Sequence, residues 1–154
     1  MVKCLSEMPE VEAHHLARIE CPTYDDTPPL AGKPLAERRV VLISTAGLHR
    51  RGDRPFQPGD GSYRVIPEET PAGERVMSHI SVNFDRTGFQ QDLNVAFPID
   101  RLRELAADGT VGSMASVHFS FMGAFPPEAA APHARHLAGL LKGDRVDAAI
   151  LVPV

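Results

Sequence analysis

The sequence has little of what several protein classes require. It contains no Trp, and aromatic residues make up 6% of its 154 residues, so a surface that stacks on nucleic-acid bases is not expected. Its two cysteines, Cys4 and Cys21, are too few for a disulfide framework or a four-cysteine zinc site. The apolar runs near 40–43 and 148–152 are far shorter than the ~20 residues of a membrane span. The first ten residues hold no apolar signal core, so we expect a cytoplasmic protein without a membrane partner.

Basic charge is also scarce. The chain has 16 Lys and Arg against 20 Asp and Glu, which gives a net charge of −4. A nucleic-acid partner normally requires a basic stripe, and the one basic patch here, at 49–54, is short. Neither G-x-G-x-x-G nor a Walker motif is present, so the sequence gives little support for nucleotide binding.

Apolar periodicity predicts alternating strands and helices. Strands are expected at 39–45, 77–85, 114–122 and 147–154, from continuous or alternating apolar residues. One helix is expected over 98–109, between Pro98 in its first turn and Gly109 at its end. A second helix is expected to open at Pro132 and end at Gly143, with 126–131 as an irregular first turn. This order predicts an α/β three-layer sandwich, Rossmann-like, with a mainly parallel sheet of about four strands.

The rest of the chain suggests two further features. A weakly amphipathic stretch at 10–19 predicts a helix, and the proline-rich segment 21–34 predicts an extended arm. We therefore divide the chain into an N-terminal helix and arm, 1–34, and an α/β domain, 35–154. The connection at 49–76 is long and rich in Gly and Pro, with one short strand expected at 63–66. Connections of that length are often functional.

Candidate site residues follow the predicted strands, because ligands of parallel α/β sheets bind beyond the carboxyl ends of the strands. A histidine in such a turn can act as an acid, a base or an anion contact, or can belong to a solvated basic turn. Asn and Asp can orient a polar substrate or cap the turn, and this applies to Asp92 and Asn94 as well. Glycines can admit a ligand or adopt a left-handed turn. The candidates are Thr45, Gly47, His49, Asn83, Asp85, Arg86, Thr87, Ser120, Met122 and Gly123.

A metal site is an alternative use of the histidines. His49, His79 and His118 could converge with Asp85 if their strands were neighbours. However, His79 lies near the start of its predicted strand and His118 in the middle of its own, so the two would lie at different heights. We therefore assign no metal ligand, and we treat a metal-dependent hydrolase as the less favoured reading.

Several segments carry a family resemblance. They are STAGLHRRGDRPF at 44–56, GDGSYRVIP at 59–67, SHISVNFDRTGFQQDLNVAFPIDRLRELAADGTVGS at 78–113, and HFSFMG at 118–123. From residue 34 onward the chain resembles the selenoprotein B family of glycine, sarcosine and betaine reductase, together with the related D-proline reductase selenoprotein. The D-R-T-G, F-P-x-D-R-L and S-F-M-G elements, in this order, are specific to that family.

The resemblance implies a reductase component that cleaves C–N bonds of small amines or amino acids. In relatives, the strand that resembles 149–154 leads directly into a selenocysteine or cysteine, followed by Pro and a second Cys, then a helix and another strand. We therefore expect this chain to be truncated at a selenocysteine codon after Val154, with its final helix and strand missing. The full-length protein would be an oxidoreductase, whereas the 154-residue chain would be inactive.

The resemblance also implies partners. A selenocysteine is expected in the full-length protein, a pyruvoyl group on a partner subunit, and a dithiol protein that restores the oxidised pair, while this chain holds no cofactor of its own. His49, Asp85 and Arg86 are expected to serve catalysis, and the remaining candidates to bind substrate. Because a missing helix would expose an apolar sheet face, we expect a homo-oligomer. The main alternative is a non-catalytic α/β module that binds a small anion or a protein.

Overall fold

The computed structural model describes residues 5–18, 23, 30–81 and 86–154. The chain forms two units, 1–30 and 31–154. The first contains a short 3₁₀ turn, η1 (Leu5–Glu7), and helix α1 (Glu10–Ala17), which confirms the predicted N-terminal helix. Helix α1 buries no residue. The predicted arm lies largely outside the described residues.

The second unit is built on strand β1 (Arg39–Ser44), which follows the 3₁₀ turn η2 (Leu35–Glu37). Strand β7 (Ala148–Val152) pairs with β1 in parallel, along 40–44. On the other side, β1 pairs in parallel with β5 (Ser113–Met114) and then β6 (Val117–Ser120). Strand β3 (Arg64–Pro67) is antiparallel to β6 and forms the opposite edge of the sheet. The sheet is mainly parallel, as predicted.

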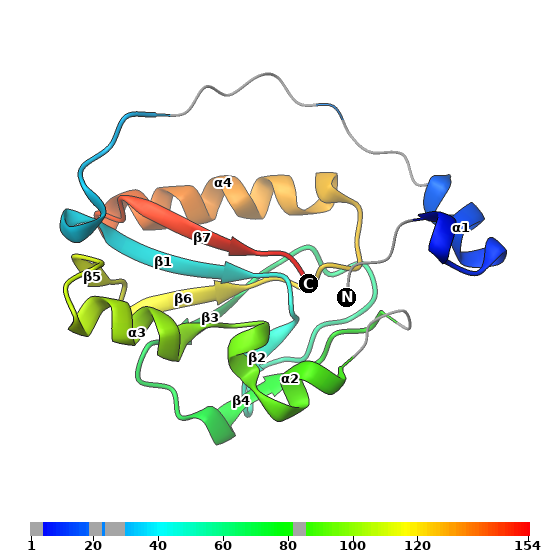
Figure 1. Cartoon of the computed structure of the whole chain (residues 1–154), viewed down its shortest axis with the longest axis horizontal. Coiled ribbons are helices and arrows are strands. Elements are labelled where there is room, and N and C mark those ends of the chain that lie inside the picture. The colour runs from blue at the N-terminus through cyan, green and yellow to red at the C-terminus, as the bar shows by residue number, and fades with distance from the viewer. Residues whose placement is uncertain (1–4, 19–22, 24–29, 82–85) are drawn as a thin grey trace. The chain divides into compact units, whose positions relative to one another are not determined.

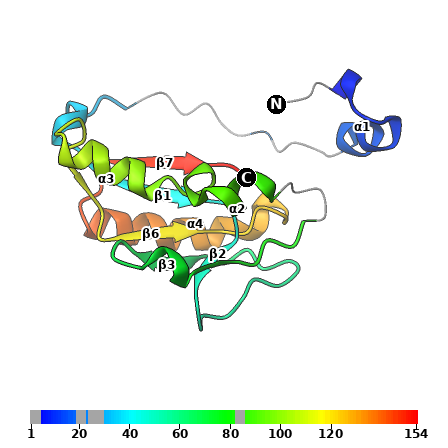
Figure 2. The same cartoon turned by 60° about the horizontal axis from the view of Figure 1, so that its bottom comes forward.

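Helices cover both faces of this sheet (Figures 1 and 2). Val40 and Leu42 of β1 pack in one core cluster with helix α3 (Ile99–Ala107). Val41, the intervening residue, packs in a second cluster with helix α4 (Pro127–Gly143). Successive residues of a strand point to opposite faces, so the apolar run of β1 is buried on both sides. The three-layer α/β prediction is therefore confirmed.

Helix α4 begins five residues earlier than predicted. It starts at Pro127, and Pro132 lies inside the helix instead of opening it. Pro127 suits the first helical position, where its missing N–H would have no helical partner in any case. Pro132 is close to that end and removes a single backbone hydrogen bond. Burial of Leu137 against the sheet helps to offset that loss.

The strand predicted at 77–85 is wrong after its first residue, over the described residues 78–81. Strand β4 (Arg75–Met77) follows the 3₁₀ turn η3 (Ala72–Glu74) and pairs antiparallel with β2 (Leu48–Arg50), outside the main sheet. Residues 78–81 are not strand, and 82–85 lie outside the described residues. Helix α2 (Thr87–Gln91) and the 3₁₀ turn η4 (Leu93–Val95) then lead to α3.

Arg64 orders the long connection after β2. Its guanidinium donates hydrogen bonds to the main-chain oxygen of Arg54 at 2.8 Å and to the carboxylate of Asp60 at 2.8 Å. It also stacks on the ring of Phe56, 4.2 Å from the centroid. The Arg64–Asp60 pair is largely buried, with 13% and 15% of the side chains exposed. The predicted strand at 63–66 is confirmed as β3.

His118 is a fully buried core residue of β6. The register between β1 and its neighbour shifts by two residues from Val40↔Met114 to Ile43↔Phe119. In this interval the Leu42 N–H donates to Nδ1 of His118 at 3.0 Å. Burial lowers the pKa of His118 to about 4, so the imidazole is neutral at physiological pH.

No helix in the described part of the chain is both long and apolar enough to cross a membrane.

Candidate functional site

The carboxyl ends of β1, β6 and β7 converge on Thr45, Gly123 and Val154, which we call the carboxyl-edge cluster. The Thr45 hydroxyl accepts the N–H of Val154 at 2.8 Å and donates to the main-chain oxygen of Val154 at 3.2 Å. The Gly123 N–H donates to the main-chain oxygen of Thr45 at 2.9 Å. A single hydroxyl therefore fixes the backbone beyond β7 against the turn beyond β1.

Gly123 is needed because of a close approach. A methyl group there would lie 3.0 Å from the main-chain oxygen of Val154 and 3.2 Å from Cβ and Oγ1 of Thr45. A side chain at this position would therefore crowd the Val154 backbone and Thr45. Of the predicted substrate-binding residues, Thr45 and Gly123 are thus brought together.

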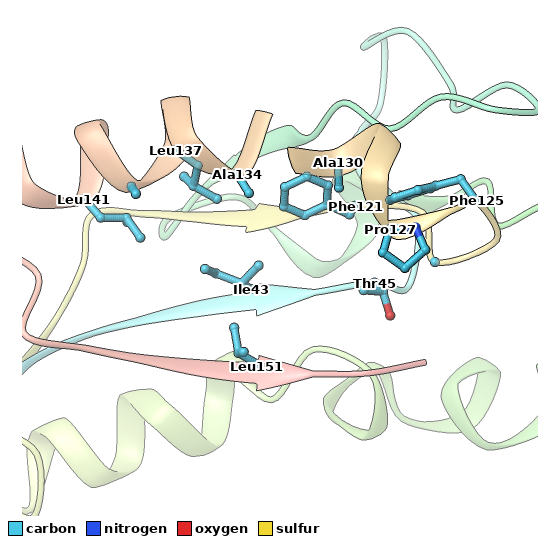
Figure 3. A pocket seen from close by; sticks show the side chains of 12 residues that line it. Ile43, Thr45, Phe121, Phe125, Pro127, Ala130, Ala134, Leu137, Leu141 and Leu151 are labelled. Atoms are coloured by element: carbon cyan, nitrogen blue, oxygen red, sulfur yellow. The ribbon is translucent and has the colours of Figure 1, made fainter. Parts of the chain in front are cut away.

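An apolar groove of about 490 Å³ adjoins this cluster, between α4 and the sheet (Figure 3). Thr45 and Gly123 lie among its lining residues, and Thr45 carries the one hydroxyl of that set. Leu151 of β7 is 69% exposed at its rim. The remaining lining residues are Ile43, Phe121, Phe125, Pro127, Ala130, Ala134, Leu137, Ala138 and Leu141. The groove can bind the apolar part of a small molecule beside the hydrogen-bonding side chain of Thr45.

The turn after β1 is shaped by Gly47, whose φ of +68° lies in the left-handed region. Its N–H donates to the oxygen of Phe121 at 2.8 Å, and its oxygen accepts the N–H of Ser78 at 2.9 Å. A methyl group at Gly47 would lie 2.9 Å from the backbone nitrogen of His79. Gly47 therefore serves a left-handed turn and a close backbone contact.

Ser120 and Met122 lie in the interior. The Ser120 hydroxyl accepts the N–H of Leu48 at 2.9 Å and donates to the oxygen of Phe121 at 3.1 Å. Met122 is fully buried, and its sulfur accepts the N–H of Ala124 at 3.3 Å. Both side chains hold the surrounding turns in place, and a substrate contact through either one stays a prediction.

His49 lies in β2 and is 4% exposed, so it is not part of a solvated turn. Its Nδ1 donates to the oxygen of Arg50 at 2.8 Å, and Nε2 is buried with no partner among the described residues. Beside it, Arg50 pairs with Asp53 at 3.1 Å, and this hydrogen bond lowers the pKa of Asp53. Within the described part of the chain, no hydrogen bond joins His49 to the carboxyl-edge cluster.

The predicted cluster around 83–87 is described only in part. Asn83 and Asp85 lie outside the described residues. Arg86 precedes α2, which begins at Thr87, and donates to the main-chain oxygen of His79 at 2.6 Å. Burial, and next the charge of Arg86, lower the pKa of His79.

Asp92 and Asn94 form a turn. The Asp92 carboxylate accepts the N–H of Asn94 at 2.9 Å, and the Asn94 side chain accepts the N–H of Asp100 at 3.0 Å. These bonds cap η4 and the start of α3. Of the two alternatives for Asp92 and Asn94, the structure therefore supports turn capping.

The metal alternative gains no support. Among the described residues, no group of three His, Cys, Asp or Glu side chains could hold an ion. His118 is committed to the Leu42 N–H in the core, and His136 to the Tyr63 hydroxyl at 2.8 Å.

Two aromatic residues of the site are not among the site residues predicted from the sequence. Phe121 and Phe125 flank Gly123 and line the groove. The signal was the pattern F-M-G-A-F, in which two large apolar rings surround a glycine at a strand end.

The fold and this edge define a class: an α/β sandwich whose candidate site lies at the carboxyl ends of its parallel strands. The family model described as glycine/sarcosine/betaine reductase selenoprotein B matches residues 61–154, which is more than half of the chain. The chain therefore belongs to the selenoprotein B family, and the predicted resemblance is confirmed.

Two curated relatives agree with this assignment. D-proline reductase subunit gamma of Acetoanaerobium sticklandii is 34% identical over 126 residues, which cover 77% of this chain and 50% of the relative. Glycine reductase complex component B subunit gamma of Carboxydothermus hydrogenoformans is 27% identical over 137 residues, which cover 84% of this chain and 31% of the relative. The chain thus spans half or less of these relatives. No solved structure matches it significantly.

Proposed function

We propose that this chain forms part of a selenoprotein-B-type reductase that cleaves a C–N bond of a small amine or amino acid, and that the reaction takes place at the carboxyl-edge cluster. The convergence of Thr45, Gly123 and Val154 beside the apolar groove carries the proposal. Membership of the family and the reductase names of both relatives support it.

In the family that the chain resembles, a selenocysteine or cysteine follows the strand that corresponds to β7, and we propose the same for the longer protein. The residues present fit such a group. The Thr45 hydroxyl bonds both the N–H and the oxygen of Val154, and the absence of a side chain at Gly123 lets the Val154 backbone approach. A selenol is ionised at neutral pH and supplies a strong nucleophile and reductant. In the net reaction, an ammonium-type substrate, a selenol and a thiol give a C–H bond, a protonated amine and a selenenyl sulfide; the protonated amine stays attached to the product when the substrate is cyclic, as in proline.

The described residues then have separate tasks. Thr45 sets the direction of the backbone after β7, and the groove shields the apolar part of a substrate from water. We propose that Arg86 holds a substrate carboxylate or the partner subunit, and that His49 donates the proton to the leaving amine. Asp85 is proposed to pair with Arg86.

The partners belong to the same proposal. Both relatives are named as subunits, one of them of a complex component. We propose that a pyruvoyl-bearing subunit holds the amine as a Schiff base and that a dithiol protein reduces the oxidised pair. Reduction of the oxidised selenocysteine–cysteine pair by the dithiol protein follows the chemistry of thiol–disulfide exchange.

The first test is the nucleotide sequence after the Val154 codon. A UGA codon followed in frame by Pro and a nearby Cys would support the proposal, and a UAA or UAG codon would contradict it. In the latter case the non-catalytic binding module would become the better reading.

If the frame continues, the longer protein is assayed with Cys or selenocysteine at that position, with proline, glycine, sarcosine and betaine and the partner subunits. Thr45→Val should lower turnover by about tenfold or more, since it removes the hydroxyl that fixes the Val154 backbone. Thr110→Val makes the same chemical change at an exposed site and should leave turnover unchanged. Unchanged turnover in His49→Ala and Asp85→Ala would remove those two residues from the mechanism.

A further inference from the structure

A second pocket, of about 370 Å³, is lined by residues of β2, β4 and α2. Figure 1 shows where these three elements lie in the fold. We call it the arginine pocket, because Arg75 and Arg86 line it from separate elements. Leu48, Met77 and Phe89 form apolar walls, and Gln90 adds a side-chain amide. It shares no lining residue with the apolar groove, and none of its described lining residues is acidic. In a protein with net charge −4, two arginines among the described lining residues of one cavity are unexpected from composition.

Arg75 has hydrogen-bonding capacity that the described residues leave unused. Its Nη2 donates to the main-chain oxygen of Thr70 at 2.6 Å, which anchors one side of the guanidinium. Its Nε is buried and has no hydrogen-bond partner among the described residues. A buried donor without an acceptor destabilises the fold, so a ligand that supplies an acceptor would bind favourably here.

The carboxylates nearest to Arg75 are engaged elsewhere. Glu68 and Asp100 attract Arg75 through space. However, Glu68 accepts a hydrogen bond from Arg103 at 2.8 Å, and Asp100 accepts one from Arg103 at 2.6 Å. The second oxygen of Asp100 accepts from the Asn94 amide at 3.0 Å. The acids facing Arg75 therefore serve Arg103 and Asn94, and no hydrogen bond of the described residues joins them to Arg75.

We propose that the arginine pocket binds a small organic carboxylate. Its carboxylate accepts hydrogen bonds from Arg75 and Arg86, and its short apolar part contacts Met77 and Phe89. Guanidinium groups suit the planar carboxylate, and the apolar walls favour an organic acid over an inorganic anion. The volume suits a molecule of amino-acid size. The proposal shares Arg86 with the proposed function, in which that arginine holds a substrate carboxylate or the partner subunit, and it rests on that function at this residue alone, because the pocket and the groove are separate cavities with no lining residue in common.

The test uses the 154-residue chain. Propionate and proline are titrated against it by calorimetry and by NMR of the backbone amides, alongside propionamide, prolinamide and inorganic phosphate. We expect a carboxylate to bind and to shift the amides of Met77, Phe89 and Gln90. The matching amide should bind at least about tenfold more weakly, because it carries no charge.

Variants locate the site. Arg75→Gln and Arg86→Gln should each weaken carboxylate binding by at least about tenfold. Arg75→Lys keeps the charge and serves as a second variant if Arg75→Gln does not fold. Arg101→Gln is the matched control, since Arg101 is an exposed arginine of α3 that pairs with Glu104 at 2.7 Å and does not line the pocket, and it should change nothing.

Four results would overturn the proposal. They are equal binding of carboxylate and amide, binding of phosphate but neither carboxylate, unchanged binding in the Arg75 and Arg86 variants, and shifts confined to groove residues such as Phe121 and Phe125. The last result would place the carboxylate in the proposed reductase site alone. Loss of the reductase proposal through a UAA or UAG codon would leave this experiment unaffected.

Discussion

Acid should destabilise this fold through buried histidines whose pKa values are lowered, His79 and above all His118. In the folded chain Nδ1 of His118 accepts the Leu42 N–H at 3.0 Å, which requires a neutral ring nitrogen. Burial lowers its pKa to about 4, against about 6.5 in an unfolded chain. Between these two values the unfolded state binds a proton that the folded state does not. Stability is therefore unaffected above about pH 6.5 and falls as the pH drops toward about 4.

The magnitude follows from the two pKa values. The linkage relation gives a loss of about 2 kcal/mol in the free energy of unfolding between pH 7 and pH 5, and about 3 kcal/mol by pH 4. Several carboxylates, such as Asp53 and Asp147, also have lowered pKa values, but their losses begin below the range of the histidine. The window between pH 7 and pH 5 therefore reports mainly on buried histidines.

Urea unfolding at pH 7 and pH 5 measures this loss. His118→Asn is the matched variant, because its side-chain oxygen can accept the Leu42 N–H but cannot titrate. The variant should be less stable at pH 7, since it leaves a cavity beside Phe97, yet it should lose about 2 kcal/mol less than the parent between the two pH values. Equal pH dependence in both proteins would refute the reasoning.

Three other changes test the packing. Gly47→Ala should lower the free energy of unfolding by about 2 kcal/mol or more, because Gly47 has a positive φ and a close backbone contact. Gly73 has open space around it, so Gly73→Ala should lower the free energy of unfolding by less than about 1 kcal/mol. Equal losses of the two variants in urea unfolding would contradict this. Asp60→Asn should cost about 2 kcal/mol because it breaks a largely buried ion pair, and an unchanged midpoint would argue against that role. Leu151→Asp should shift the chain toward monomer in sedimentation, since Leu151 is exposed on edge strand β7; a parent chain that is already monomeric would remove the expected association.

The elements that could be predicted are those whose burial shows in their own sequence. Strands β1 and β7 are short apolar runs, and α3 has an apolar face bounded by Pro98 and Gly109. A parallel strand that is buried on both faces has a continuous apolar sequence, so these strands could be predicted without knowing which strands they pair with. The start of α4 could not be read in this way, because a proline near a helix start is tolerated when the rest of the helix packs well.

Strands β2 and β4 could not be foreseen, because each has three residues and pairs with a segment far away in sequence. The alternating pattern at 77–85 is misleading because hydrogen bonds to other segments replace the expected ladder. The Ser78 N–H bonds to Gly47, its hydroxyl accepts the N–H of Phe56, and His79 accepts a bond from Arg86. Local alternation gives no information about such contacts.

The candidate site was predictable at the level of strand ends. Thr45 follows a strand that was correctly placed, and Gly123 follows β6, the second of the two strands into which the predicted strand 114–122 is divided. The rule about carboxyl ends brings the two residues together. The sequence pattern could not show that Ser120 and Met122 turn inward, since residue type alone does not distinguish a buried hydroxyl from an exposed one. Nor could it show the arginine pocket, because Arg75 and Arg86 meet there only through β4 and α2.

The order of the strands also has a consequence for synthesis on the ribosome. The first strand of the sheet, β1, lies at its centre and pairs with β7. The pair between Val40 and Ala148 can therefore form only after Ala148 has been synthesised. At about 5–20 residues per second, the ribosome needs about 5–20 s to make the intervening chain. During that interval the apolar run of β1 has no β7 to cover its edge, and it is exposed to chaperones and to other nascent chains. The step most sensitive to translation rate should therefore be the closing of the sheet around its first strand.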